Sequence, residues 1–218
     1  CNDIRVIGSG NIAGVDESFF TPASLDVKNS ERKNLGIPAE AFVFCYVGRL
    51  NPEKGISELL GAFQELSGNI FLILAGGVDK SHSLSDNDLN MIRAHPKILP
   101  LGQIDDVRRV FSASDVNILV SYREGFPNVL LESFSMGIPS IATNVNGSRE
   151  VVINDKTGWL VPAKSKNAVA EAMLNSMSKE VDLKELGVNC RQLILDQFTR
   201  GAYLQELKCF YENLDVRS

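Results

Sequence analysis

Short apolar runs recur along the chain, and each is followed by a stretch with helical character. The runs are rich in Val, Ile, Leu and Phe and are not broken by regular polar positions, which is typical of strands buried on both faces of a parallel sheet. They cover residues 41–48, 69–77, 97–102, 115–121, 138–143 and 157–162. The helical stretches between them are about ten residues long, so we expect an α/β fold with a doubly wound parallel sheet.

The carboxyl-terminal part of the chain has a different pattern. Three helical segments are expected at about 165–178, 182–196 and 199–214, with no strand between them. They predict a helical tail that packs on the sheet or reaches toward a missing partner domain. The chain opens at Cys1 without Met and reads as the middle of a strand, so we expect a piece of a longer protein.

Composition excludes several classes of protein. The net charge of the 218 residues is -5, which argues against a nucleic-acid-binding surface. No apolar run approaches the roughly 20 residues of a membrane-spanning helix. The four Cys residues are far apart, and neither they nor His82 and His95 have partners at metal-ligand spacing, so we expect buried free thiols and no metal site.

Ligands of doubly wound sheets bind where strands end and helices begin. The first such junction is "YVGRLNPEKG", residues 46–55, in which Gly48 allows close backbone approach. Arg49 and Lys54 flank a turn that contains Pro and opens a helix. Cations at a helix amino terminus oppose the helix dipole, and an anionic ligand would resolve this conflict. The alternative is that Arg49 pairs with a surface carboxylate while Lys54 is solvated.

The second junction is "REGFPNVLLES", residues 123–133. Pro127 fixes a turn, Asn128 is expected to cap the following helix, and Gly137 is expected to end it after about two turns. Gly125, Phe126 and Pro127 would then lie at the mouth of a site, beside the first free N–H groups of the helix.

Two glutamates lie eight positions apart in this junction. Glu132 stands among apolar neighbours, and a buried carboxylate without a partner is costly, so we expect a polar group to meet it. The pair Glu124 and Glu132 could act as general acid and base, as in glycosidases, or accept hydrogen bonds from ligand hydroxyls. They could also be plain carboxylates on a helix surface.

Three other patterns are weaker. The Gly-rich turn "NVNGSREVV", residues 144–152, carries Arg149 and Glu150 and follows another strand. It could also be a turn that only connects two elements and has no functional role. The segment "GSGNIAG", residues 8–14, does not match the dinucleotide-binding fingerprint. The acidic "DND" at residues 86–88 is best explained as the start of a helix.

Taken together, these motifs resemble the carboxyl-terminal half of GT-B glycosyltransferases of the large retaining group called family 4. The match runs from about Val6 to Pro162, and it includes "GRLNPEKG", "LAGG", "SYREGFPNVLLESFSMGIPSIAT" and "TGWLVP". The Glu-(seven residues)-Glu pattern is moderately specific. Together with the upstream Arg-(four residues)-Lys pattern it is strongly so.

The resemblance implies a role for each matching position. Arg49 and Lys54 are expected to neutralise the diphosphate of a nucleotide-sugar, and Glu124 to contact the donor sugar, so these three are the expected catalytic residues. Glu132 is expected to accept hydrogen bonds from ribose hydroxyls, and Leu101, Gly102 and Gln103 to form the wall on which the base stacks. The remaining expected donor-binding positions are Gly48, Gly125, Phe126, Pro127, Asn128, Val129 and Glu150.

The resemblance also implies a domain plan. Residues 1–16 would form an interdomain linker and first-strand region, 17–198 the Rossmann-like domain that binds the nucleotide-sugar, and 199–218 a carboxyl-terminal helix. An amino-terminal domain that holds the acceptor sugar or lipid-linked glycan would be missing, so this piece alone is expected to be inactive in transfer.

The expected activity is that of a retaining hexosyltransferase using a UDP- or GDP-sugar without a metal or other cofactor. The sequence of residues 121–132 is similar to that of transferases in bacterial surface polysaccharide or lipopolysaccharide synthesis. A cytoplasmic protein is expected, with peripheral association at the inner membrane face through the missing domain. The alternatives are a non-catalytic nucleotide-binding or interaction module and a nucleotide-sugar epimerase of the same architecture.

Overall fold

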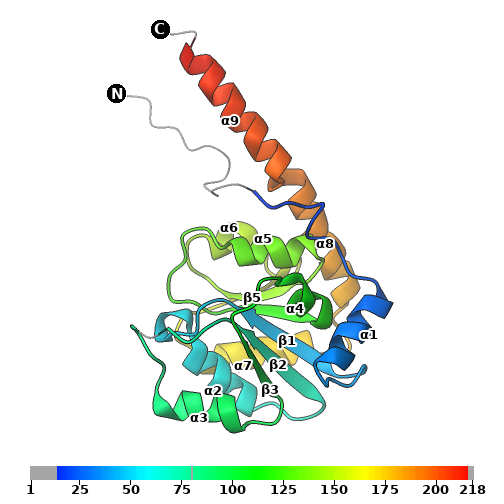
Figure 1. Ribbon diagram of the computed structural model, residues 1–218, viewed down its shortest axis with the longest axis vertical. Coiled ribbons are helices and arrows are strands. Elements are labelled where there is room, and N and C mark those ends of the chain that lie inside the picture. The colour runs from blue at the N-terminus through cyan, green and yellow to red at the C-terminus, as the bar shows by residue number, and fades with distance from the viewer. Residues whose placement is uncertain (1–13, 80, 216–218) are drawn as a thin grey trace.

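A six-stranded sheet forms the centre of the molecule (Figure 1). The computed structural model describes residues 14–79 and 81–215. All strand pairings are parallel, and the strand order is β3-β2-β1-β4-β5-β6. The strands are β1 (Phe42–Val47), β2 (Ile70–Ala75), β3 (Ile98–Gly102), β4 (Val116–Leu119), β5 (Ser140–Thr143) and β6 (Gly158–Val161). Each apolar run contains one strand, which confirms the predicted doubly wound parallel sheet.

Helices connect the strands and continue beyond the last one. They are α1 (Leu25–Asn34), α2 (Ile56–Gln64), α3 (Asp86–Ala94), α4 (Arg108–Ala113), α5 (Asn128–Ser135), α6 (Ser148–Val151), α7 (Lys166–Ser176), α8 (Leu183–Gln197) and α9 (Arg200–Asp215), together with the 3-10 turn η1 (Pro52–Lys54). The three predicted tail helices correspond to α7, α8 and α9, so this prediction is confirmed.

Strand β1 shows why both faces of the sheet must be covered. Phe44 and Tyr46 belong to the core that packs against α2 and α7, whereas Val43 and Cys45 belong to the core that contacts α4. All four side chains are fully buried. A strand with apolar residues on both sides reads as a continuous apolar run, which is why the pattern predicted the fold.

Helix α1 was not predicted from the sequence. Its only buried residue is Arg32, so it has no apolar stripe to reveal it. The Arg32 guanidinium donates to the backbone carbonyls of Ala113 and Ala41 and forms a 2.7 Å ion pair with Asp115. A buried arginine with polar partners replaces the usual apolar anchor of the helix.

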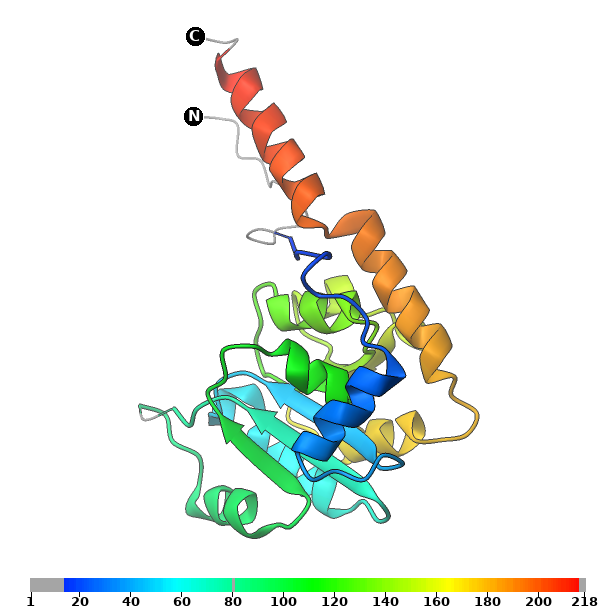
Figure 2. The same ribbon diagram turned by 45° about the vertical axis from the view of Figure 1, so that its right-hand side comes forward.

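The tail leaves the sheet domain. Helix α8 runs along the domain, and α9 extends away from it (Figures 1 and 2). Cys45 and Cys190 are buried free thiols, as predicted, but Cys209 on α9 is exposed, so that part of the prediction is wrong. Cys1 lies outside the described residues. Within residues 14–79 and 81–215, no helix combines the length and apolar character that crossing a membrane requires.

The two ends of the described domain meet. The Val15 N–H donates to the Phe198 carbonyl, and the Arg200 N–H donates to the Val15 carbonyl, each over 2.8 Å. These contacts lie near both predicted boundaries of the domain at residues 17–198. The division itself stays a prediction.

The strand order changes direction between β1 and β4. From β1 the chain moves outward to β2 and β3, then returns to β4 on the other side of β1. Helices that follow β1 and β4 therefore diverge to opposite faces, and the loops at their starts face one another across the sheet edge. The first and second junctions follow these two strands.

Candidate functional site

The first junction, between β1 and α2, is held in a fixed shape. The Asn51 side chain accepts a 3.1 Å hydrogen bond from the Lys54 N–H and so caps η1. Gly55 has φ +68°, and a Cβ there would overlap the carbonyl group of Val120, just past β4. This close approach fixes where Lys54 leaves the backbone relative to β4.

The second junction, between β4 and α5, carries Glu124. Its backbone is tied to the first junction, because the Tyr122 N–H donates to the Glu53 carbonyl over 2.8 Å. Helix α5 begins at Asn128, and Pro127 occupies the cap position. The prediction that Asn128 caps the helix is therefore wrong, because Asn128 already lies within the helix. Among the described residues no side chain caps the free N–H groups of α5.

An ion pair joins the two junctions. The Lys54 ammonium lies 2.6 Å from a carboxylate oxygen of Glu124, and the side chains are only 26% and 12% exposed. Restricted access to water makes such a pair stronger than one on the open surface. Two of the three residues expected to be catalytic are thus brought into direct contact at the point where the strand order changes direction.

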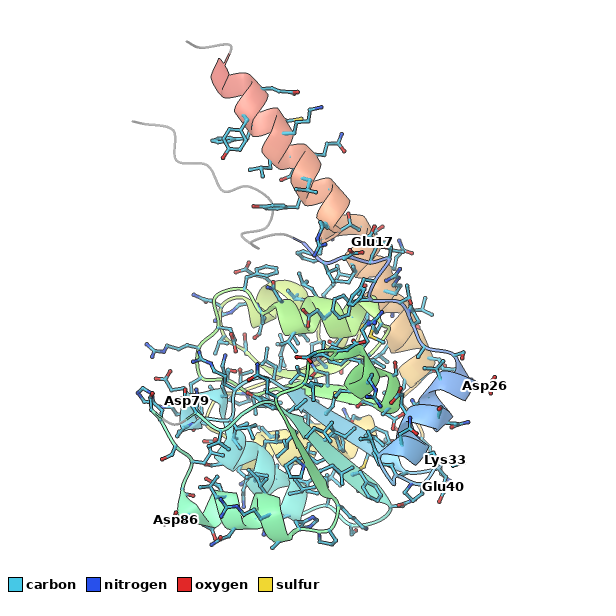
Figure 3. All side chains as sticks on the ribbon, viewed as in Figure 1. Glu17, Asp26, Lys33, Glu40, Asp79 and Asp86 are labelled. Carbon is cyan, nitrogen blue, oxygen red and sulfur yellow. The ribbon has the colours of Figure 1, made fainter. Side chains whose placement is uncertain are left out.

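The third, Arg49, points toward solvent. Its side chain is 75% exposed, and the guanidinium lies 3.6 Å from the Asp79 carboxylate. Arg49 lines a cavity of about 470 Å³ at the carboxyl ends of β1, β2 and β3, together with Gly48 and Gln103. Figure 3 shows Asp79 on the side of the molecule opposite Lys33 and Glu40. The cavity therefore lies at the sheet edge where the ligand was expected.

Sequence reasoning missed Asp79. Its carboxylate accepts hydrogen bonds from the backbone N–H groups of Ser81 and His82, which lower its pKa most through the Ser81 contact. The available signal was its place just after the "LAGG" strand end, where an acid would face the cations of the neighbouring junction.

Tyr46 lies beneath the first junction. Its phenol donates a 2.8 Å hydrogen bond to the Arg49 carbonyl. A Cβ at Gly48 would come within 2.9 Å of the Tyr46 phenol oxygen. Burial, followed by the nearby negative charge of Glu124, raises the Tyr46 pKa above its usual range. The phenol therefore remains a hydrogen-bond donor under the Arg49 turn.

Glu132 is the unusual acid of α5. Partial burial desolvates its carboxylate and raises its pKa to about 7, and no polar side chain or backbone group within the described residues bonds this carboxylate. The polar partner expected from the sequence is therefore not found among the described residues. The carboxylate keeps its full hydrogen-bonding capacity for another partner, at the cost of its own desolvation.

The third junction packs directly on the second. A Cβ at Gly147 would overlap the Gly125 carbonyl group and lie 3.1 Å from Pro127, so only glycine fits there without movement. This residue has φ +77° and ψ -57°, which also favours glycine. Arg149 and Glu150 are both exposed on α6. In the described part of the chain Glu150 forms no hydrogen bond or ion pair with the other candidate residues.

The remaining candidates lie around these contacts. Leu101 and Gly102 end β3 beside Gln103. Phe126 is partly buried, with its ring centroid 5.8 Å from that of Phe198, and Val129 is partly buried against the same core as Phe134. The structure thus gathers Gly48, Arg49 and Gln103 around one cavity, Lys54 with Glu124, and Gly125 and Pro127 against Gly147.

Other features do not belong to this site. A cavity of about 700 Å³ lies near the amino end of β6, and it is lined by none of the candidate donor residues. In the "DND" segment, Asp88 accepts from the hydroxyls of Ser57 and Ser85, and Ser85 caps α3. No cluster of three or more His, Cys, Asp or Glu side chains in residues 14–79 and 81–215 is arranged to hold a metal ion.

Comparison with known proteins identifies the family. The family model described as "Glycosyl transferases group 1" matches residues 27–193. This chain belongs to the group 1 glycosyl transferases. The matched range includes all three junctions, so the residues gathered at the sheet edge are part of the family's shared region.

Two relatives extend the match. The capsular polysaccharide biosynthesis glycosyltransferase CapM of Staphylococcus aureus is 28% identical over 213 residues, which is 96% of this chain and 55% of CapM. The UDP-Gal:alpha-D-GlcNAc-diphosphoundecaprenol alpha-1,3-galactosyltransferase of Escherichia coli is 30% identical over 212 residues, covering 93% of this chain and 53% of the relative. The chain thus spans about half the length of the curated relatives it matches.

The fold agrees with the family. Sucrose-phosphate synthase from Thermosynechococcus elongatus superimposes with a TM-score of 0.83 and 28% identity, covering 94% of this chain and 52% of the synthase. The GT-B resemblance inferred from the sequence is therefore confirmed for the sheet domain of this group 1 glycosyl transferase.

Proposed function

We propose that this chain is the donor-binding half of a retaining glycosyltransferase that uses a UDP- or GDP-sugar. The observation that carries the proposal is the Lys54–Glu124 ion pair at the change in strand order, within the region matched to the family. It places a cation and an acid where the ligands of such sheets bind. The name of the Escherichia coli relative contains UDP-Gal and so supports a UDP-sugar in particular.

Cleavage of a sugar–diphosphate bond leaves negative charge on the diphosphate. In this proposal Arg49 and Lys54 stabilise that charge, together with the uncapped N–H groups at the start of α5. Arg49 is open to solvent beside a cavity, so an incoming phosphate can reach it. The two cations take the role that a divalent metal plays in other transferases, so no metal is required.

Lys54 must change partners to do this. In the structure its charge is balanced by Glu124. A bound diphosphate attracts the ammonium, while the sugar hydroxyls donate to the Glu124 carboxylate. The ion pair is thus replaced by two contacts to one donor molecule, with the ammonium beside the diphosphate and the carboxylate hydrogen-bonded to hydroxyls.

Glu132 is proposed to bind the ribose. Its carboxylate has no protein partner among the described residues, and desolvation raises its pKa to about 7. Ribose hydroxyls would donate the missing hydrogen bonds and favour the ionised form. Glu124 and Glu132 position the donor in this scheme and do not act as a hydrolytic pair.

The acceptor is proposed to be a sugar or lipid-linked glycan in the synthesis of bacterial capsular polysaccharide, lipopolysaccharide or a similar surface polymer. The names of the two relatives support this class of acceptor. It would be held by a part of the protein outside this chain, in the cytoplasm at the inner face of the membrane. This chain alone would then bind a donor without transferring its sugar.

A ligand screen tests the proposal. UDP-, GDP- and ADP-sugars are added to this chain, and the thermal midpoint is measured. A donor at 100 times its Kd should stabilise the fold by about 2.7 kcal/mol. The Lys54→Ala variant should lose most of the shift. Absence of a shift with all three nucleotides, in both this chain and the longer protein, would rule the proposal out.

A further inference from the structure

The Lys54–Glu124 pair needs a device that fixes its geometry. Both residues lie in connecting segments, Lys54 at the end of η1 and Glu124 in the loop before α5. Long side chains on loops lose conformational freedom when they are held together, and this limits the strength of an isolated pair. The contacts between the two segments therefore decide how well the pair is formed.

Tyr122 provides a partly buried side-chain contact between these segments. It lies two residues before Glu124, and its phenol donates a 2.7 Å hydrogen bond to Glu58 Oε1 in the first turn of α2. Glu58 lies four residues after Lys54. The Tyr122–Glu58 bond and the Lys54–Glu124 pair thus run between the same two segments, next to each other.

The bond is not easily replaced. Glu58 Oε2 is buried and has no hydrogen-bond partner among the described residues, so the phenol is the partner of a largely desolvated carboxylate. Removing the hydroxyl would leave both oxygens unpaired, which is more costly than the bond is favourable. The Lys164 ammonium lies 4.9 Å from the Tyr122 ring centroid and helps to hold the ring in place.

The phenol is a donor at every physiological pH. Burial, followed by the hydrogen bond and negative charge of Glu58, raises the Tyr122 pKa to about 12. The phenol therefore keeps its proton under conditions in which the enzyme would work.

A neighbouring contact joins the same segments but is exposed. Arg123 and Glu53 form a 3.1 Å ion pair, with side chains 83% and 67% exposed. Exposed pairs of this kind contribute little to stability. The Arg123–Glu53 pair therefore offers a matched control for the partly buried Tyr122–Glu58 bond.

We infer that Tyr122 and Glu58 are positioning residues. They hold the Lys54 and Glu124 side chains next to each other at the point where the strand order changes direction. The inference deepens the proposed function, on which it rests for its catalytic meaning. Neither residue is expected to touch the donor. Their action is to keep the Lys54 ammonium and the Glu124 carboxylate at the separation from which both reach one ligand.

The test measures the pair without any ligand. The coupling between Lys54→Met and Glu124→Gln is obtained from urea unfolding of the single and double variants, in the native background and in Tyr122→Phe. In the native background we expect a coupling of about 3-fold to 5-fold in the unfolding equilibrium constant. In the Tyr122→Phe background the Lys54–Glu124 coupling should fall to about 1-fold, which means no coupling. In the Arg123→Ala background the coupling should stay at its native value.

Two further variants complete the design. Glu58→Gln keeps an acceptor for the phenol and should retain the coupling. Glu58→Ala removes the same bond from the other side and should lose it, even if Tyr122→Phe proves too unstable to study. A role limited to overall stability would lower the unfolding midpoint of each background and leave the coupling intact, and that result would overturn the inference.

Nucleotide titration separates this inference from the proposed function. Calorimetry with UDP and GDP should show affinity about tenfold weaker in Tyr122→Phe than in the native chain and unchanged in Arg123→Ala, since a misplaced charge contact to a phosphate has about this effect. Loss of coupling with no nucleotide binding by any protein would support the positioning role and contradict the donor site.

Discussion

The Lys54 ammonium lies 2.6 Å from the Glu124 carboxylate, although the two residues are 70 positions apart in the chain. Each comes from a connection at the carboxyl end of a strand, and the two strands, β1 and β4, are neighbours in the sheet. The pair is neutral as a whole. A donor that binds there must offer both an anion and hydroxyl groups to replace the contact.

Loss of either proposed diphosphate cation should be severe. In the longer protein, Arg49→Ala or Lys54→Ala should reduce turnover by on the order of a hundredfold or more, because stabilisation of a developing anion has that scale. A radiolabelled sugar-transfer assay measures it. Lys33→Ala, on α1 at the other side of the molecule, is the control (Figure 3). Near-normal turnover in both site variants would remove the proposed role.

Glu132→Ala should weaken nucleotide binding. The carboxylate is proposed to accept hydrogen bonds from ribose hydroxyls, each worth about 1.5–3 kcal/mol when the acceptor is charged. Calorimetry should therefore show at least a tenfold loss of affinity for both UDP and GDP. The control Glu171→Ala, which removes an exposed acid on α7, should leave the affinity for UDP and GDP unchanged. Unchanged affinity in Glu132→Ala would contradict ribose binding by this residue.

Glu132 should also make stability depend on pH. Burial raises its pKa in the folded protein to about 7 from the usual 4.5, so the folded state binds this proton more tightly than the unfolded state does. Its contribution is fully present below about pH 4.5 and is lost as the pH rises through 7, with a change of up to about 3 kcal/mol.

The Glu132→Gln variant isolates this effect. It should remove most of the loss between pH 5 and 8, so that the variant gains on the native protein as the pH rises. Urea unfolding at several pH values measures the difference. Parallel curves of unfolding free energy against pH for the native protein and the variant would show that burial does not raise the pKa of the Glu132 carboxyl group.

Gly147→Ala should disturb the loop that carries Glu124. A Cβ there would overlap the Gly125 carbonyl group, and the backbone conformation is unfavourable for any other residue. We expect a loss of about 1–3 kcal/mol in unfolding free energy together with weaker UDP binding. Gly201→Ala on α9, where a Cβ meets nothing within 4 Å, should be neutral or slightly stabilising. Equal effects of the two changes would argue against tight packing of the junctions.

Arg32→Ala should destabilise the domain far more than Arg109→Ala. Arg32 is buried, and its loss removes one of the two cations paired with Asp115, the other being Lys28, together with the donor to the Ala113 and Ala41 carbonyls, which costs up to about 3–5 kcal/mol. Arg109 pairs with Glu31 but is 62% exposed, so its loss should cost at most about 1 kcal/mol. Urea unfolding compares them directly, and similar values would show that α1 is not held by Arg32.

Much of the candidate site could be predicted because local pattern and chemistry agreed. The predicted strands, which end near residues 47 and 121, place Arg49, Lys54 and Glu124 at one edge of the expected sheet from the sequence alone. The helix around Asn128 was also expected, but its start was displaced by one residue because Pro127 takes the cap position. Boundaries depend on a single backbone angle, which sequence patterns do not specify.

The errors share a physical cause. Helix α1 is anchored by a buried arginine, which departs from the rule that charged residues avoid the interior, and the Asp115 partner of this arginine is 83 positions away in the chain. Asp79 and the Tyr122–Glu58 bond were missed because their partners are far away in sequence. A residue type indicates what a side chain can bind, but not which side chain it will meet.

The sequence by itself determined the layered α/β architecture, the order of its strands and helices, and the ends of the strands at which charged residues gather. Those features depend on periodicity and turn chemistry within short segments. Only the tertiary structure decided that Lys54 pairs with Glu124, that Arg49 faces a cavity beside Asp79, and that Glu132 has no partner within residues 14–79 and 81–215. These depend on how strands distant in sequence become neighbours in one sheet, and on the exclusion of water that follows from their packing.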